Sequence, residues 1–474
     1  MYLHHTRKIG FFELYYLGRN QLKCYTNYCI IAKYNHALNQ SILSPALRQV
    51  VLANPYLAAN FFPASSVASF DNYDLRAVDQ IRFEDVVEYK TVSQIDESLL
   101  EEINTYTCKM DETERPLWRV IVYTTPESDE TPHVCFYCDH TLFDGTSGTS
   151  FHKKLIRELG NVGELGPTSG DILFNYEADK DLLPKFPQSS DKYVNNKPPA
   201  IFVAKFLFRV LSPQWLRRTF IYLWNRTPVI GGSARDRLLE KYPIFRGLPA
   251  NTSTATRFKI INLPPSDSAG VLKYCKEKHL TFTPLLYTVG IKTLQDTILL
   301  ASMPFATEAI ISVTTRRYLA KEQMGQHDFG LFVGPQPLIN PPISQISVPE
   351  IIRVQEDIAA GLEARTPLYT VGMLKYVDVK DFLNGILGKL KETFEISNLG
   401  LQNVVSADGR WEIQDMLFSQ CFGRTSPYFC LSVVSTKSGG LNLVLGMAPE
   451  YCDANPELVD QFASELTKNI MARY

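Results

Sequence analysis

The sequence predicts an α/β architecture in which two halves of the chain have a similar layout. Its 474 residues are many for one hydrophobic core, which favours two or three domains or subdomains. Strand-like and helix-like segments alternate through both halves, as they do in α/β proteins. Hydrophobic residues make up 45% and charged residues 21% of the chain, the usage of an ordinary globular protein.

The first half is expected to hold at least three strands and two helices. The strand-like segments are rich in β-branched and aromatic residues, and one helical segment begins with Ser-Pro. The strands are predicted at 25–34, 117–123 and 133–140, and the helices at 44–53 and 150–159. From 165 to 199 the composition turns to Pro, Ser, Asn and Asp, which indicates a long crossover.

The second half repeats this alternation. Strands are predicted at 258–263, 309–313 and 430–434, and helices at 266–278, 284–294 and 455–471. We therefore expect an N-terminal subdomain over 1–195, a crossover over 196–255 and a C-terminal subdomain over 256–474.

The crossover contains an unusually apolar segment, 200–224, with four Lys and Arg residues. One interpretation is an element that lies on a membrane surface, with apolar groups in the acyl region and cations at the headgroups. The other is a buried connection between the subdomains. The second is favoured because Ser212-Pro213 breaks the segment into two short pieces.

Charge and cysteine content exclude some classes of protein. The net charge of -2 gives no electrostatic argument for a nucleic-acid partner. Nine thinly spread cysteines are unlike a disulfide scaffold and favour a reducing compartment. The first residues lack the apolar core of a signal peptide, and no apolar stretch reaches the roughly 18–20 residues that span a bilayer. A cytoplasmic protein, at most peripheral on a membrane, is expected.

The strongest candidate for chemistry is His140, at the end of a predicted strand. An aspartate, Asp144, follows four residues later and can hold the turn, and Gly145 permits a close backbone approach. A histidine with a pKa near 6.5 is largely neutral at pH 7 and can accept a proton from a hydroxyl or amine. Of the eight histidines only His140 has this pattern. The alternative is a histidine that merely caps a strand.

A zinc site is a competing interpretation of the same region, since His133, Cys135, Cys138 and His140 lie close together. Successive side chains of a strand face opposite ways, so the first two and the last two would lie on different faces. Four-fold coordination is therefore not expected, and no metal is predicted.

The pattern from His140 to Gly145 resembles the H-x-x-x-D-G signature of the CoA-dependent acyltransferase superfamily. Over nearly its whole length the chain resembles, more specifically, the fungal alcohol acetyltransferase family. Further ordered motifs carry this resemblance in both halves. They lie at 7–16, 116–119, 280–284, 315–319, 396–400 and 417–420.

The resemblance implies a two-layer α/β sandwich of two chloramphenicol-acetyltransferase-like subdomains around a central substrate tunnel. His140 would deprotonate the acceptor as it attacks the thioester of acetyl-CoA, the co-substrate, without a covalent enzyme intermediate. Asp144 would orient the loop, and Gly145 would supply loop backbone. No bound cofactor is implied.

Five more residues are candidates for substrate or CoA binding. Thr283 with Pro284 forms a good helix start, either as the N-cap alone or with its hydroxyl near the oxyanion. The resemblance favours Ser397 and Asn398 near the pantetheine arm over an ordinary turn.

Arg316 and Arg317 are expected to pair with CoA phosphates or with an internal carboxylate, unless they form a solvated surface pair.

The expected function is acetyl transfer from acetyl-CoA to a lipophilic alcohol. N-acetylation of a long-chain sphingoid base is the alternative within the family resemblance. A catalytically silent, condensation-like binding module is the alternative from another class. A monomer is expected, with possible peripheral contact with the endoplasmic reticulum or lipid droplets through 200–224.

Overall fold

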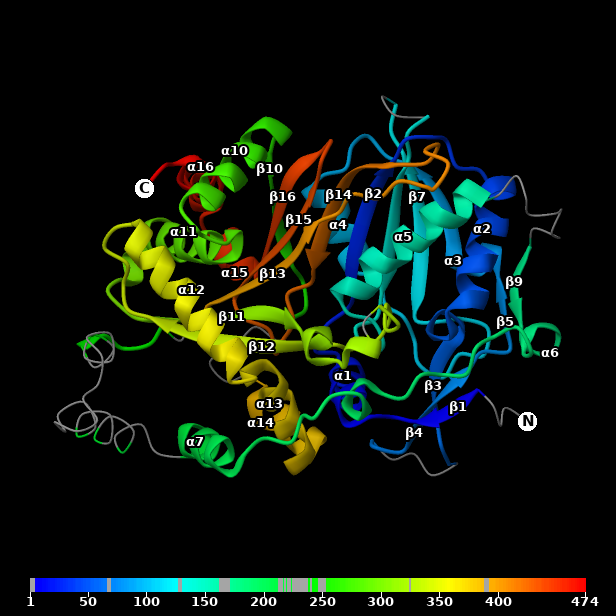
Figure 1. Ribbon diagram of the computed structural model, residues 1–474, viewed down its shortest axis with the longest axis horizontal. Helices are drawn as coiled ribbons and strands as arrows, with labels where there is room; N and C mark the ends of the chain where they lie inside the picture. The colour runs from blue at the N-terminus through cyan, green and yellow to red at the C-terminus, as the bar shows by residue number, and fades with distance from the viewer. Residues whose placement is uncertain are drawn as a thin grey trace.

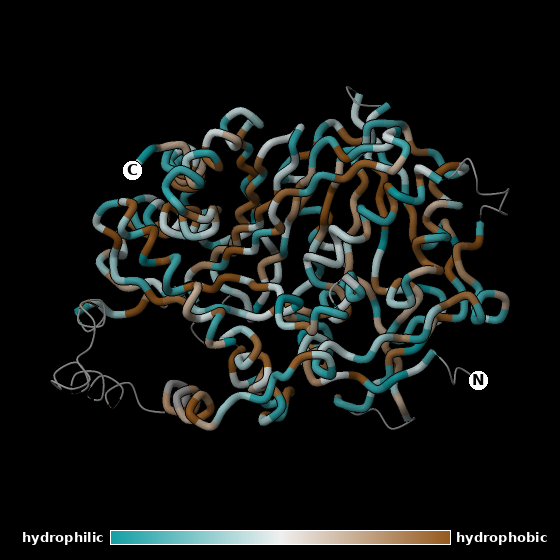
Figure 2. The backbone as a smooth tube through the Cα atoms, viewed as in Figure 1, coloured by the Kyte–Doolittle hydropathy of each residue, from teal (hydrophilic) through white to brown (hydrophobic). Residues whose placement is uncertain are grey.

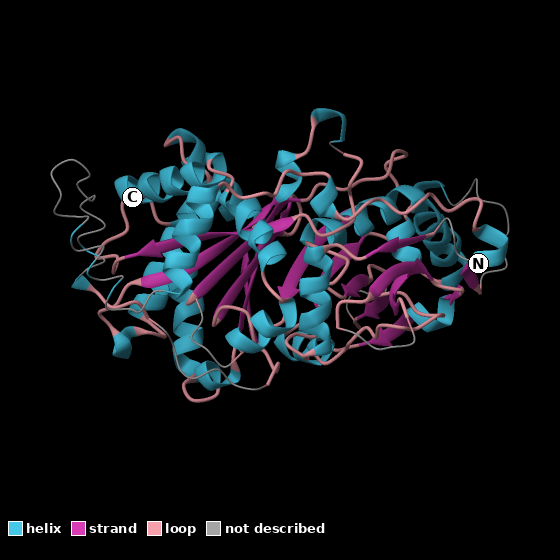
Figure 3. Ribbon diagram, turned by 90° about the horizontal axis from the view of Figure 1, so that it is seen from below, coloured by secondary structure: helices cyan, strands magenta, loops and turns pink. Residues whose placement is uncertain are grey.

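The computed structural model describes residues 5–65, 70–126, 130–161, 171–211, 241–245, 253–323, 325–387 and 392–474, with the single residues 216, 219, 223 and 238. Two large sheets lie side by side along the longest axis of the molecule, and helices pack outside them (Figure 1). The turned view separates the two groups of strands from the helices that enclose them (Figure 3). The predicted α/β fold is confirmed.

The sheet of the N-terminal half has five strands in the order β14-β2-β8-β7-β6. Helices α2 and α5 cover it, and its apolar residues form the larger core. One of its edge strands, β14, comes from the far end of the chain and pairs antiparallel with β2. These elements are β2 (Tyr28–Tyr34), α2 (Gln40–Ala53), β6 (Val87–Thr91), β7 (Trp118–Thr124), β8 (His133–Cys138), α5 (Gly145–Asn161) and β14 (Ile413–Gln420).

The second sheet has six strands in the order β10-β16-β15-β13-β11-β12. Its central strands β11, β13 and β15 are parallel to one another, and helices α10, α11, α12 and α16 pack on one face. The strands are β10 (Arg257–Leu263), β11 (Thr307–Thr314), β12 (Val333–Asn340), β13 (Phe394–Leu401), β15 (Phe429–Thr436) and β16 (Gly440–Met447). The helices are α10 (Pro265–Glu277), α11 (Phe282–Asp296), α12 (Val348–Glu363) and α16 (Pro456–Met471).

Shorter elements connect and surround these layers, including the small sheets β1-β4-β3 and β5-β9. They are β1 (Thr6–Lys8), α1 (Phe11–Gln21), η1 (Pro55–Ala58), β3 (Ala59–Pro63), β4 (Tyr73–Ala77), β5 (Gln80–Arg82), α3 (Phe83–Val86), α4 (Glu97–Asn104), β9 (Ile172–Asn175), α6 (Tyr176–Asp179), η3 (Ser190–Lys192), α7 (Ala200–Leu211), η4 (Leu300–Ser302), η5 (Thr315–Tyr318), η6 (Lys321–Gln323), α13 (Thr366–Gly372), η7 (Met373–Tyr376), α14 (Val379–Ile386) and α15 (Pro449–Cys452).

Some boundaries differ from the sequence predictions. The strand that was expected to reach His140 ends at Cys138, so His140 lies in the loop that follows. Helix α5 begins at Gly145 instead of 150, because Ser147 and Asp144 satisfy its first turn. The predicted crossover 165–199 contains the short elements β9, α6 and η3 in its described part.

The division of the chain at 195 and 255 stays a prediction, and β14 complicates it. This strand belongs to the N-terminal sheet but also contacts the second sheet, where Gln420 Nε2 donates to Ser432 Oγ at 3.1 Å. Figure 1 shows β14 between the two sheets. β14 therefore lies at the interface of the two halves: it pairs in the first sheet, although its residues come from the C-terminal half of the chain.

Only part of the apolar segment 200–224 lies within the described residues. Its helix α7 is strongly apolar in Figure 2, and Ile201 on it is exposed. Phe202 packs edge-on against Tyr369, with ring centroids 5.6 Å apart. Among the described helices, none is both long and apolar enough to span a membrane.

Candidate active site

The loop after β8 carries His140 between two tyrosines from different elements. The imidazole stacks on the Tyr16 ring of α1, with centroids 4.4 Å apart and planes 15° apart. Tyr28 of β2 meets it edge-on at 5.3 Å, and the Tyr28 hydroxyl donates to the backbone carbonyl of Asp144 at 2.5 Å. The ring orientation is thus fixed from two sides.

Burial holds the pKa of His140 at about 4, below its ordinary value, and the Arg19 cation acts in the same direction. The imidazole's own backbone carbonyl and Asp144 act against this shift. Nδ1 is buried and has no hydrogen-bond partner in another of the described residues. The imidazole is consequently neutral near pH 7.

Asp144 does not face the imidazole; it anchors the loop to the second half of the chain. Its carboxylate accepts from Arg316 Nη1 at 2.6 Å and Nη2 at 3.2 Å. The Phe332 amide and the Ser147 amide each donate to it at 2.9 Å. Burial acts to raise the pKa of Asp144, but Arg316 and these hydrogen bonds hold it below its ordinary value. The carboxylate is therefore ionised, and both of its oxygens accept hydrogen bonds.

Gly145 lies where a side chain would crowd the Leu399 side chain of β13. A Cβ at this position would stand 2.7 Å from Cδ2 of Leu399 on β13, and real Cβ atoms essentially never come that close to a heavy atom. Glycine at the first position of α5 thus allows the two halves to approach at the loop.

Asp139 is a second anchor of the loop, and the sequence analysis assigned it no role. Its buried carboxyl accepts from the Tyr25 hydroxyl at 2.5 Å, from Asn20 Nδ2 at 2.6 Å and from the Thr141 amide at 2.7 Å. Asn20 lies in the last turn of α1, so Asp139 ties that helix to the loop that carries His140. The only sequence feature that could have indicated this role is that Asp139 is a charged residue directly before the candidate histidine.

The structure brings Thr283 and Asn398 together and separates Asn398 from Ser397. Asn398 Nδ2 donates to Thr283 Oγ1 at 3.2 Å. Ser397 is on the opposite face of β13, toward the N-terminal half, because neighbouring strand residues alternate. The alternative of an ordinary turn is wrong, since both residues lie in a strand.

The prediction that Thr283 is an N-cap is also wrong. Helix α11 begins at Phe282 and its N-cap is Thr281. The Thr281 hydroxyl donates to Gln355 Oε1 at 3.1 Å, so Thr283 lies in the first turn.

The two arginines have different surroundings. Arg316 pairs with the internal carboxylate of Asp144, and its Nε donates to the His327 carbonyl at 2.6 Å. Of the alternatives left by the sequence, the structure thus favours the internal pair for Arg316. Arg317 is exposed, with its guanidinium 5.9 Å from the centre of the Tyr318 ring. Binding of CoA phosphates by Arg317 stays a prediction.

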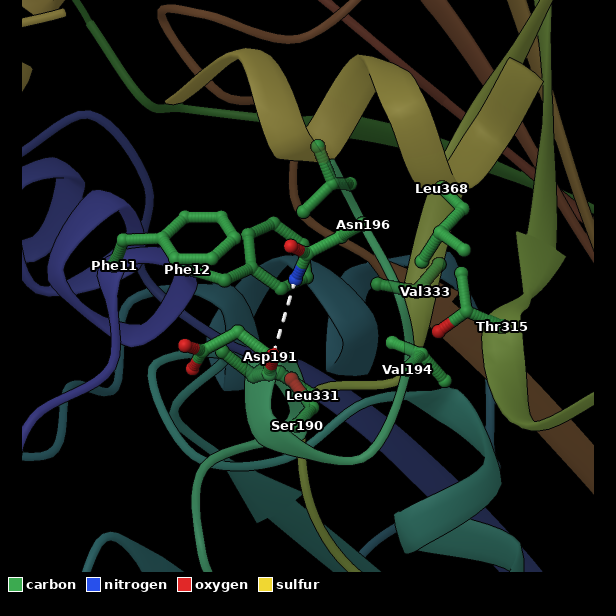
Figure 4. A pocket seen from close by; sticks show the side chains of 11 residues that line it. Phe11, Phe12, Ser190, Asp191, Val194, Asn196, Thr315, Leu331, Val333 and Leu368 are labelled. Atoms are coloured by element: carbon green, nitrogen blue, oxygen red, sulfur yellow. Dashed lines mark hydrogen bonds between the residues drawn. The ribbon is translucent and has the colours of Figure 1, made fainter. Parts of the chain in front are cut away.

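A small cavity lies beside α1. Phe11 and Phe12 face it from α1, Asp191 from η3 and Leu368 from α13, and Asn196 Nδ2 donates to the Asp191 carbonyl at 3.3 Å (Figure 4). Its volume is about 10 Å³, room for about one water molecule.

A larger hollow, of about 290 Å³, lies between the end of α2 and the segment around Asp328. Neither hollow includes His140, and the predicted tunnel stays a prediction.

Comparison with protein families matches residues 8–470 to the alcohol acetyltransferase family. Alcohol O-acetyltransferase 1 of Saccharomyces cerevisiae is 25% identical and aligns over 93% of this chain and 90% of its own length. The probable alcohol acetyltransferase FCK4 of Fusarium pseudograminearum is 22% identical, over 87% and 83% respectively.

Solved structures with the same fold include acyltransferases and condensation domains. The trichothecene 15-O-acetyltransferase TRI3 of Fusarium sporotrichioides superposes with a TM-score of 0.64 at 12% identity, over 98% of this chain and 95% of that one. The first condensation domain of the CDA synthetase gives a TM-score of 0.57 at 13% identity, over 99% and 97%. At these identities the likeness shows the fold alone.

Proposed function

The chain belongs to the alcohol acetyltransferase family, and on that premise we propose that it transfers the acetyl group of acetyl-CoA to the hydroxyl of a lipophilic alcohol, with His140 as general base. Membership of the family makes it an acyltransferase. The observation that carries the proposed mechanism is the neutral imidazole of His140, which packs between the rings of Tyr16 and Tyr28.

The surroundings of His140 support Nε2 as the basic atom. A neutral imidazole carries one proton, and which nitrogen holds it is set by the partner of that nitrogen. Nδ1 is buried and has no hydrogen-bond partner among the described residues. A buried nitrogen is not accessible to the acceptor, so in the proposed mechanism the proton stays on Nδ1 and Nε2 keeps the lone pair.

In the proposed reaction, Nε2 takes the proton of the acceptor hydroxyl as that oxygen attacks the thioester carbonyl. The C–S bond of the tetrahedral intermediate then breaks, and the CoA thiolate leaves with the proton returned by the imidazolium. The ester and free CoA are the products, and no covalent enzyme intermediate forms. The Asp144–Arg316 pair would position the loop, and Ser397 would face the bound thioester from β13.

We also propose that acetyl-CoA is a co-substrate only, that no cofactor is resident, and that the protein is a cytoplasmic monomer. Thr283, Asn398 and Arg317 are proposed to lie along the path of CoA. Contact with a membrane through 200–224 is a further proposal, supported by the apolar, exposed face of α7.

The test is product formation from acetyl-CoA by the purified protein, with isoamyl alcohol and phytosphingosine compared as acceptors. His140→Ala should lower the rate by about 10²–10⁴-fold, the usual contribution of a general base. The matched control is His36→Ala, which removes an exposed histidine and should change the rate by less than about twofold. If only an amide product forms, the acceptor is a sphingoid base and not an alcohol. Binding of CoA without product would support the silent module.

A further inference from the structure

The larger hollow of the structure, of about 290 Å³, has no part in the proposed reaction. It lies between the end of α2, the crossover around residue 185 and the segment 325–329. None of the residues assigned to acetyl transfer lines it. Its volume is close to that of the smaller pockets that hold organic ligands in proteins. The hollow therefore has room for a ligand of its own.

One buried side chain that lines this hollow lacks a polar partner. His327 is only 9% exposed, and the centre of its ring lies 4.1 Å from that of Tyr193 and 5.4 Å from that of Phe332. Its backbone carbonyl accepts a hydrogen bond, but neither ring nitrogen has a hydrogen-bond partner among the described residues. Buried polar groups are normally paired, because an unpaired one has lost its water without a replacement. The imidazole thus has spare hydrogen-bonding capacity in the wall of the hollow.

The charged residues of the lining give it an excess of positive charge. Lys154 of α5 pairs with Asp328 at 2.8 Å, so these two charges largely cancel. Lys185, from the crossover, is exposed and has no ion pair with a described residue. Two buried aromatic side chains, Tyr56 and Phe329, supply apolar surface. A ligand that complements this lining has an anionic group and an apolar part, because a cation would be repelled by the unpaired ammonium.

The segment that holds His327 also supports the loop of the candidate active site. Arg316 Nε donates to the His327 carbonyl at 2.6 Å, and Nη2 lies 3.4 Å from the Asp328 carbonyl, which accepts from it. The same guanidinium holds the carboxylate of Asp144. A ligand that restrains the backbone at 327 and 328 therefore acts on the group that anchors the loop.

We propose that the hollow binds a small organic anion, either a phosphate monoester or a carboxylate, and that the bound anion raises the rate of acetyl transfer. Its anionic group pairs with the Lys185 ammonium and accepts from the His327 imidazole, and its apolar part packs on the aromatic rings. The restrained carbonyl of His327 then holds Arg316, and with it Asp144, more firmly. The binding stands apart from the proposed function, whereas the effect on the rate rests on it.

Binding is measured by isothermal titration calorimetry of the purified chain with phenyl phosphate, benzoate and benzamide. The two anions distinguish a phosphate ligand from a carboxylate ligand, and benzamide is the probe without charge. At least one anion should bind, and benzamide should bind about tenfold more weakly or not at all. Lys185→Gln and His327→Gln should each weaken binding of that anion by about tenfold, the worth of one hydrogen bond to a charged group. Lys468→Gln, at an exposed lysine of α16, is the matched control for Lys185→Gln and should bind like wild type.

The second measurement is kcat for acetyl transfer with and without the anion at saturation. Wild type should gain about twofold or more, the lower end of couplings between distant sites, with an unchanged KM for acetyl-CoA. Lys185→Gln should lose this gain at low anion concentration and keep the basal rate. Because Lys185 is exposed, this variant should fold normally, and thermal unfolding checks the fold of His327→Gln.

Three binding results would overturn the inference. They are the absence of binding by both anions, equal binding by Lys185→Gln and wild type, and displacement of the anion by CoA in competition, which would place the hollow on the path of the donor. Binding as proposed without a change in kcat would overturn the effect on the rate. All of these leave the proposed function standing. Absence of acetyl transfer to every acceptor would overturn the proposed function, and the calorimetric result would still decide whether the hollow binds an anion.

Discussion

His140 combines two properties at the scale of a single residue: a fixed ring orientation and a suppressed positive charge. Tyr16 and Tyr28 supply the first through ring contacts. Burial and the nearby Arg19 cation supply the second. Asp144 contributes little to the charge of the imidazole because its own carboxylate is bound to Arg316. Asp144 thus holds the loop, and in the proposed mechanism His140 acts on the substrate without it.

The first prediction concerns the pH dependence of kcat/KM. His140 accepts a proton only when neutral, and its pKa is lowered to about 4. Activity should therefore stay level from about pH 8 to about pH 5.5 and fall only as the pH drops through the lowered pKa. Arg19→Gln removes the cation and should move this acid limb upward. Rates measured after brief pH jumps check both points, and a wild-type limb centred near pH 6.5 would contradict them.

The second prediction concerns the Asp144–Arg316 pair, in which both side chains are mostly buried. Removing one partner leaves an unpaired buried charge, which typically costs about 3–5 kcal/mol. Asp144→Asn and Arg316→Gln should each lower the free energy of unfolding by about that amount, and the double variant by much less than the sum. Urea titration of the four proteins measures this coupling. Additive losses would show that the pair does not join the loop to the second half.

At the scale of elements, α1 and β13 both contact the region from His140 to Gly145. Asp139 fastens the end of α1 to the loop through Asn20 and Tyr25. The side chain of Leu399 on β13 lies so close to the start of α5 that a Cβ at 145 would require it to shift. The position of His140 therefore depends on two elements that are distant from it in the sequence.

The third prediction follows from the close approach of α5 and β13. Gly145→Ala would place a Cβ against Leu399, and overpacking of this kind typically costs about 1–3 kcal/mol. Leu399→Ala alone should cost less, because Leu399 is only partly buried. In the double variant, Leu399→Ala should restore the stability that Gly145→Ala removes, and part of the lost activity. Thermal unfolding and kcat/KM of the four proteins test this. If Leu399→Ala does not rescue Gly145→Ala, the new Cβ clashes with a group other than Leu399.

At the scale of the whole molecule, local patterns predicted the fold class and the central motif, and contacts between distant segments explain what they missed. The turn from His140 to Gly145 is visible in six consecutive residues. The partner of Asp144, by contrast, lies 172 positions away, and no local pattern indicates it. Similarly, nothing in the sequence of β14 shows that it pairs with β2 in the sheet of the other half.

The last prediction concerns the stability of the whole fold in acid, which buried histidines should limit. His152 of α5 is completely buried, where Tyr34 and the Ile30 carbonyl are its partners at 3.0 and 3.1 Å, and burial lowers its pKa to about 4. The unfolded chain binds a proton at this side chain near pH 6.5, whereas the folded chain does not until about pH 4. Folding is therefore penalised progressively as the pH falls between these values, by about 3 kcal/mol for this residue.

His152→Gln should accordingly flatten the pH dependence of the unfolding free energy between pH 6.5 and 4, even if it lowers stability at pH 8. His36→Gln makes the same substitution at an exposed histidine and is the matched control. Urea titrations at half-unit pH steps give both slopes. Equal slopes for wild type and His152→Gln would mean that other groups, such as His133 with its pKa also lowered to about 4 by burial, set the acid limit of the fold.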